Sequence, residues 1–122
     1  MFGSISQVRI DNHTTEWFNV GLGVRQGDTL SPTLFCLFIN DLVKELNDLK
    51  KGIDITNAHI SILLYADDVV LIADNETNLQ CQLDTLSIWC KKWHINVNEQ
   101  KTNIVHYKPP RRPRTLYNFK LG

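Results

Sequence analysis

The sequence predicts an α+β fold in which two helices pack on one face of an antiparallel sheet. Short apolar runs bounded by turn residues indicate strands, and two longer stretches repeat apolar residues at intervals of three and four, as amphipathic helices do. The chain has 122 residues, of which 43% are hydrophobic, and its formal net charge is zero. These values suit a single domain with a modest core.

The stretch 59–74 sets two adjacent acids, Asp67 and Asp68, between two apolar runs rich in Val, Ile and Leu. We expect two short strands, buried on both faces and joined by a tight turn that carries the acids at its tip. Neighbouring carboxylates repel each other and an unpaired buried charge is costly, so the pair favours a hard divalent cation, Mg²⁺ or Mn²⁺. Because Asp also favours turns, a hairpin that merely closes in solvent is the alternative.

A hairpin and a glycine-rich loop are predicted in the first part of the chain. Residues 5–10 and 17–22 read as two strands joined by a polar turn. The loop follows at residues 21–28, where three glycines indicate positive φ angles or a close approach of the backbone to a ligand. Arg25 and Gln26 add a cation and an amide to this loop, although a plain loop has the same composition.

The first helix should run from Ser31 to about residue 51. Ser31 can cap its free amides, Pro32 suits the first helical position, and Gly52 can stop it. The expected buried stripe consists of Leu34, Phe35, Phe38, Leu42, Leu46 and Leu49.

The second helix should span residues 76–93, with Asp74 or Asn75 as its cap. Its apolar stripe comprises Leu79, Leu83, Leu86, Cys90 and Trp93. Trp89 and Trp93 lie on or beside this stripe, so they are expected to belong to the core rather than to a platform for stacking bases.

The last part of the chain is predicted to contain three further strands, within residues 94–102, 103–107 and 116–121. Between the last two lies a basic, proline-rich connector, residues 108–115, which cannot form a helix. Residues 101–122 contain six basic residues and no acidic one, a net charge of +6, while the rest of the chain carries −6. This asymmetry favours contact with a polyanion, and a solvated charged tail is the alternative.

No apolar run approaches the roughly 20 residues that a membrane span needs, and residues 1–4 lack the features of a signal peptide. We therefore expect an intracellular location, cytoplasmic or nuclear, and no membrane partner. Cys36, Cys81 and Cys90 have no metal-binding spacing and are expected to be structural thiols rather than zinc ligands or disulfides.

Two motifs in order give the sequence a specific resemblance. Tyr65-Ala66-Asp67-Asp68 resembles the Tyr-x-Asp-Asp box of reverse transcriptases, in the form common in non-LTR retrotransposon and group II intron enzymes. Residues 23–32, Gly-Val-Arg-Gln-Gly-Asp-Thr-Leu-Ser-Pro, followed by Leu34-Phe35 and residues 39–42, are similar to motif B of the non-LTR enzymes. The resemblance implies a partial polymerase palm over residues 1–122, with motifs B, C and D.

The resemblance also implies roles for single residues. Asp67 and Asp68 would be catalytic metal ligands, and Tyr65 would contact the substrate. In the motif B loop, Arg25, Gln26 and Gly27 would touch template or incoming nucleotide. Lys101 falls in the motif D region, where it would be a phosphate contact or the acid for the leaving group; a surface turn lysine is an equal alternative.

The function implied is RNA-directed DNA synthesis, in which deoxynucleoside triphosphates extend a DNA primer along an RNA template by two-metal phosphoryl transfer. This chemistry needs a third carboxylate from motif A, but Asp11 and Glu16, the acids before the glycine-rich loop, fall in or beside a turn. Motif A and the thumb are therefore expected to be absent, and the isolated chain to be inactive. A non-catalytic, nucleic-acid-binding or structural remnant of a retroelement is the alternative; motif B disfavours an unrelated metal-dependent hydrolase.

Overall fold

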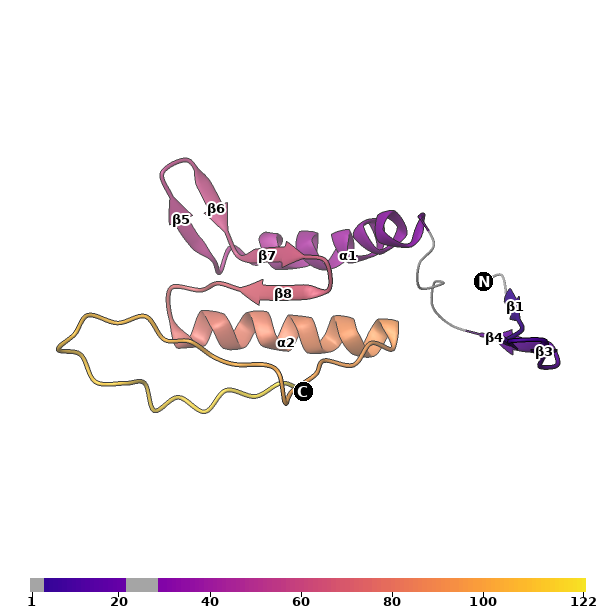
Figure 1. Ribbon diagram of the computed structural model, residues 1–122. Helices are drawn as coiled ribbons and strands as arrows, with labels where there is room; N and C mark the ends of the chain where they lie inside the picture. The colour runs from indigo at the N-terminus through magenta and orange to yellow at the C-terminus, as the bar shows by residue number, and fades with distance from the viewer. Residues whose placement is uncertain (1–3, 22–28) are drawn as a thin grey trace. The chain divides into compact units, whose positions relative to one another are not determined.

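The computed structural model describes residues 4–21 and 29–122, and the chain divides into two units, residues 1–36 and 37–122 (Figure 1). Within the described residues there are two helices and four two-stranded antiparallel sheets. This mixture confirms the α+β class. The expected single sheet is replaced by separate two-stranded sheets, because each described strand pairs with a single other strand.

The first unit contains the predicted hairpin, in two short ladders. β1 (Ser4–Ser6) pairs with β4 (Phe18–Val20), and β2 (Arg9–Ile10) pairs with β3 (His13–Thr14) around a turn that starts at Asp11. The two predicted strands are interrupted between these ladders. There the Thr15 hydroxyl accepts a hydrogen bond from the Val8 N–H at 3.1 Å, so a side chain takes the place of a regular ladder partner.

Helix α1 (Ser31–Asp48) begins at the predicted residue and ends three residues early. Lys50 takes the left-handed conformation, with φ of 52°, and its N–H donates to the Asn47 carbonyl at 3.1 Å. Lys50, rather than Gly52, therefore ends the helix. The buried residues of α1 are Ile39, Leu42 and Leu46, so the core stripe includes Ile39 and excludes the half-exposed Leu34.

Helix α2 (Glu76–Trp93) has the predicted bounds. The Asn75 side chain caps it by accepting a hydrogen bond from the Asn78 N–H at 2.8 Å, and His94 ends it in the left-handed conformation. Its buried apolar residues are Leu83, Leu86, Trp89 and Cys90.

An aromatic cluster joins the two helices. Phe38 of α1 lies 5.1 Å from Trp89 and 5.0 Å from Trp93, measured between ring centroids, and the second contact is edge-to-face. Trp89 is buried as predicted, whereas Trp93 is 39% exposed at the edge of the cluster. Such pairs contribute about 0.5–1.5 kcal/mol each beyond the burial of their surface.

Two hairpins follow α1. β5 (Ile53–Ile55) pairs with β6 (Ala58–Ile60), and β7 (Ile62–Tyr65) pairs with β8 (Asp68–Leu71). The apolar run before the acids, expected to be one strand, is divided at Ser61, which is fully buried and lies between β6 and β7.

Residues 95–122 contain no strand, so the strands predicted there are wrong. Alternating apolar residues do not form a strand without a partner backbone, and here side chains hold the segment instead. The Gln80 amide donates to the Lys120 carbonyl at 2.9 Å and accepts from the Lys120 N–H at 3.0 Å. The pKa of the Glu76 carboxyl, in the first turn of α2, is lowered. The main causes are a hydrogen bond from the Glu76 backbone N–H and one from the Thr115 side chain, with a smaller contribution from His106.

Neither α1 nor α2, the helices of the described residues, has the length and apolarity that a membrane crossing requires. The three cysteines are free thiols, with Cys36 and Cys81 exposed and Cys90 buried. Burial raises the pKa of the Cys90 thiol.

Among the described glycines, Gly52 is the one whose backbone neighbours leave no room for a side chain. A Cβ added there would overlap the Ile60 carbonyl oxygen and lie 2.7 Å from the Ser61 Cα, both of them backbone atoms. We expect Gly52→Ala to destabilise the second unit by about 1–3 kcal/mol, the usual cost of overpacking, and to lower Tm by several degrees. Thermal unfolding followed by circular dichroism measures this.

Gly21→Ala is the matched control, because a Cβ at Gly21 meets no atom within 4 Å. Equal melting temperatures for the wild type and both variants would contradict the close approach of Gly52 to β6.

Candidate functional site

The two acids lie at the tip of the β7–β8 hairpin, as predicted. Tyr65 and Asp68 form the last cross-strand pair, so Ala66 and Asp67 make a two-residue loop. Ala66 has a φ of 51°, a left-handed conformation that is unfavourable for a residue with a Cβ and common at the first position of such tight loops. The tight turn is therefore confirmed.

The faces of the hairpin differ in exposure. Directly opposite residues share a face, which puts Tyr65, Asp68, Leu63 and Val70 together. Leu63 is 50% and Val70 52% exposed. On the other face the pair Ile62 and Leu71 is half-buried, and the pair Leu64 and Val69 is 38% and 37% exposed. The prediction that both strands are buried on both faces is thus wrong. Burial would require a further layer on the Leu63 face, and the described residues supply none.

Asp67 and Asp68 are both exposed, and within the part of the chain that is described neither carboxylate makes a hydrogen bond or ion pair. Asp67 belongs to the turn and Asp68 to the first position of β8, so the two carboxylates leave the backbone in different directions. The described residues include no cluster of three or more His, Cys, Asp or Glu side chains suited to a metal ion. The hairpin offers two carboxylates with free oxygens.

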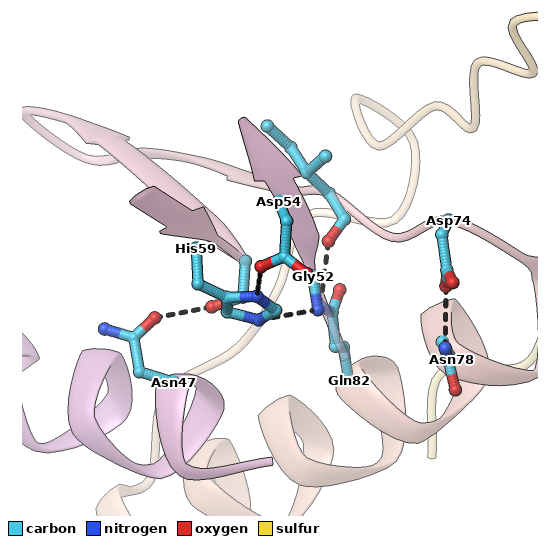
Figure 2. Close-up of polar contacts among 9 residues, drawn as sticks. Asn47, Gly52, Asp54, His59, Asp74, Asn78 and Gln82 are labelled. Atoms are coloured by element: carbon cyan, nitrogen blue, oxygen red, sulfur yellow. Dashed lines mark hydrogen bonds and ion pairs between the residues drawn. The ribbon is translucent and has the colours of Figure 1, made fainter. Parts of the chain in front are cut away.

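The open end of the hairpin is held by polar contacts to both helices (Figure 2). The Ser61 hydroxyl donates to the Asn47 side-chain oxygen of α1 at 2.6 Å, and the Ile72 N–H donates to the Ser61 carbonyl at 2.9 Å. The Gln82 amide of α2 donates to the Ile72 carbonyl at 2.9 Å. The base of the hairpin is therefore fixed while its acidic tip remains exposed.

Sequence reasoning missed these anchoring residues. Ser61 interrupts an apolar run and Gln82 interrupts the stripe of α2, so polar residues within apolar patterns were the available signal. Buried polar side chains need hydrogen-bond partners, and such positions predict specific contacts.

A second polar cluster joins the β5–β6 hairpin to the chain before it (Figure 2). His59 and Asp54 are cross-strand partners, and their side chains meet at 2.7 Å between Nδ1 and Oδ1. The Gly52 N–H donates to His59 Nε2 at 3.2 Å. Since Nε2 accepts, Nδ1 carries the proton and donates to Asp54. This cluster stabilises the start of the segment that leads into the acidic hairpin.

The remaining predicted site residues lie away from the hairpin or outside the described residues. Arg25, Gln26 and Gly27 fall in residues 22–28, which are not described. Lys101 is exposed in a turn, where its N–H donates to the Asn98 carbonyl at 3.1 Å. Within the described residues no hydrogen bond or ion pair joins Lys101 to the β7–β8 hairpin. The structure thus brings together Tyr65, Asp67 and Asp68.

The chain is similar in sequence to a known protein family and to several known proteins. Residues 1–117 match the family described as reverse transcriptase (RNA-dependent DNA polymerase). The chain is 32% identical over 97 residues to the retrovirus-related Pol polyprotein from the type-1 retrotransposable element R2 of Popillia japonica, covering 79% of this chain and 16% of that protein. It is 39% identical over 98 residues to the Pol polyprotein from the type-2 element R2DM of Drosophila melanogaster, covering 80% of this chain and 9% of that protein.

A further relative is the RNA-directed DNA polymerase from the mobile element jockey of Drosophila melanogaster. It is 25% identical over 100 residues, which cover 77% of this chain and 10% of that protein. The chain therefore spans between about a tenth and a sixth of the length of these relatives. No solved structure matches the chain.

Proposed function

Because this chain belongs to the reverse transcriptase family, we propose that its β7–β8 hairpin is the metal-holding element of an RNA-directed DNA polymerase. The observation that carries the proposal is the exposed carboxylate pair at the tip of a hairpin fixed at its base by Ser61 and Ile72. Relatives named RNA-directed DNA polymerases support it. The substrates would be an RNA template, a DNA primer and deoxynucleoside triphosphates.

The donor set of the hairpin fits a hard divalent cation. Mg²⁺ is commonly held by one or two carboxylates together with waters and substrate phosphates, and Mn²⁺ accepts the same oxygen ligands. Asp67, at the tip, would be the main ligand, and Asp68, one residue along β8, a supporting one. When bound, such a cation stabilises negative charge on the phosphoryl group and lowers the pKa of the attacking hydroxyl.

The other predicted residues would orient the substrates. Tyr65 is 82% exposed opposite Asp68, so its ring is free to pack against a nucleotide. Arg25, Gln26 and Gly27 would contact template or incoming nucleotide, as the motif B resemblance implies. The exposure of Lys101 is compatible both with a phosphate contact and with a surface turn lysine.

The first test is Asp67→Asn in a protein that carries the complete polymerase domain. Losing one anionic ligand should reduce primer extension on an RNA template by at least about a hundredfold, since metal stabilisation is worth several kcal/mol. Mn²⁺ binding, followed by electron paramagnetic resonance, should weaken in parallel.

Asp48→Asn is the control for the loss of one negative charge, because Asp48 is exposed at the end of α1, away from the hairpin tip in sequence. Near-normal primer extension by the Asp67 variant would refute the metal-holding role.

A second prediction concerns the motif B loop. In the same full-domain protein, Arg25→Ala should raise KM for the nucleotide or lower kcat, while Tm changes little, because removing a side chain that contacts substrate leaves the core intact. A large fall in Tm with unchanged kinetics would assign Arg25 a structural role instead.

A third prediction concerns the 122-residue chain by itself. With two carboxylates on the hairpin and nine tenths or so of its relatives' length outside the match, the isolated chain should produce no templated DNA with Mg²⁺ or Mn²⁺. Primer extension with purified chain measures this. Product that disappears on Asp67→Asn would show that the chain alone is a complete catalyst.

A further inference from the structure

A long excursion of the chain follows α2 and returns to it. The Thr115 N–H donates to His106 Nδ1 at 3.4 Å near the middle of the segment, and the paired hydrogen bonds between Gln80 and Lys120 hold its end to α2. In Figure 1 it is the orange-to-yellow loop that leaves the helix and comes back beside it. Residues 107–114, between His106 and Thr115, form a projection without helix or strand.

The tip of this projection is a proline-rich turn, which we call the basic turn (residues 108–114). The Arg112 N–H donates to the Pro109 carbonyl at 3.1 Å, which closes a four-residue turn with Pro110 at its second position. The Lys108 ammonium, directly before these four residues, donates to the Arg112 carbonyl at 2.6 Å. Three prolines restrict the backbone, so the turn loses little further entropy on binding a ligand.

The basic turn presents three unneutralised guanidinium groups. Arg111, Arg112 and Arg114 are exposed, and none forms an ion pair with another of the described residues. Residues 101–122 contain no acidic residue. Guanidinium groups fit the oxygens of phosphates in a bidentate manner, so this arrangement suits a ligand with several phosphates.

An exposed aromatic residue directly precedes the basic turn in the sequence. Tyr107, immediately before the basic turn, is 92% exposed. An exposed ring beside cationic groups is the arrangement by which proteins bind single strands, since bases stack on the ring while the phosphates meet the cations. A duplex keeps its bases stacked on one another and offers such a ring no free base.

We propose that Tyr107 and the basic turn form a binding site for single-stranded RNA, separate in sequence from the β7–β8 hairpin. The proposal rests on the proposed function, in that an RNA template is the ligand expected of this family. It adds a second point of contact, at which Arg111, Arg112 and Arg114 bind phosphates and Tyr107 stacks on a base.

The test measures binding of a labelled single-stranded RNA of about 15 nucleotides to the 122-residue chain by fluorescence anisotropy, without divalent metal or nucleotide. The triple variant Arg111→Gln, Arg112→Gln, Arg114→Gln should bind at least tenfold more weakly at low salt. Its slope of log K against log salt should be smaller by about 2, since three phosphate contacts are lost.

The charge-matched control is Lys44→Gln, Lys50→Gln, Lys91→Gln, which removes three exposed cations from the helices and the turn after α1. It should change the affinity by less than threefold. A second pair of variants tests stacking: Tyr107→Ala should weaken binding roughly fivefold or more, whereas Tyr107→Phe, which keeps the ring, should bind like wild type.

The proposal is overturned if wild-type chain does not bind the RNA, if both triple variants lose affinity equally, or if Tyr107→Ala has no effect. Equal affinity for a duplex RNA of the same length, or tighter binding to vesicles that contain phosphatidylserine, would assign the basic turn to another ligand. Because the assay contains no metal and reports no synthesis, a failure here differs from a failure of the Asp67 experiment, which concerns the metal-holding role.

Discussion

The hydrogen bonds of Ser61 and Ile72 are the constraint on which the acidic hairpin depends. A two-stranded hairpin is at best marginally stable alone, and β7–β8 has no third strand among the described residues. Asn47 from α1 and Gln82 from α2 therefore act as clamps on the base of the hairpin. Breaking one clamp would leave a buried polar group without its partner, at a cost of about 1–3 kcal/mol.

Asn47 and Gln82 hold the base of the hairpin in place only because the helices that carry them are themselves fixed by apolar packing. Leu42 and Leu46 are almost completely buried, and Phe38 contacts both tryptophans of α2. Truncating a buried leucine to alanine typically costs about 2–5 kcal/mol, so the apolar core has more energy at stake than any single polar contact of the unit. The apolar core thus fixes the helices, the helices fix Ser61 and Ile72, and these fix the direction of the acidic tip.

Charge is divided between two parts of the chain that have different proposed tasks. The acidic tip carries two adjacent carboxylates, and the basic turn carries four cations with no acid after residue 99. A net charge of zero therefore does not argue against binding nucleic acid. The carboxylates attract a cation and repel phosphate, whereas the guanidinium groups do the opposite. Separate elements for the two charges allow metal and nucleic acid to bind without competing for the same side chains.

The sequence by itself determined the elements that depend on neighbouring residues. The bounds of α2 follow from the Asn75 cap and the apolar period, and the tight turn at Asp67 follows from two short apolar runs around a polar pair. The family could likewise be recognised from the ordered motifs at residues 23–32 and 65–68, since motifs are properties of the sequence alone.

Tertiary structure decided the exposure of the strands and the anchoring of the hairpin. Leu63 and Val70 have the composition of buried residues, but burial requires another element to cover them, and composition does not state which elements meet. Whether residues 103–107 form a strand depends in the same way on a partner backbone, which is absent among the described residues. Ser61, Asn47, Ile72 and Gln82 are distant in sequence. The Ser61–Asn47 and Gln82–Ile72 hydrogen bonds exist only because tertiary packing brings α1 and α2 to the base of the hairpin.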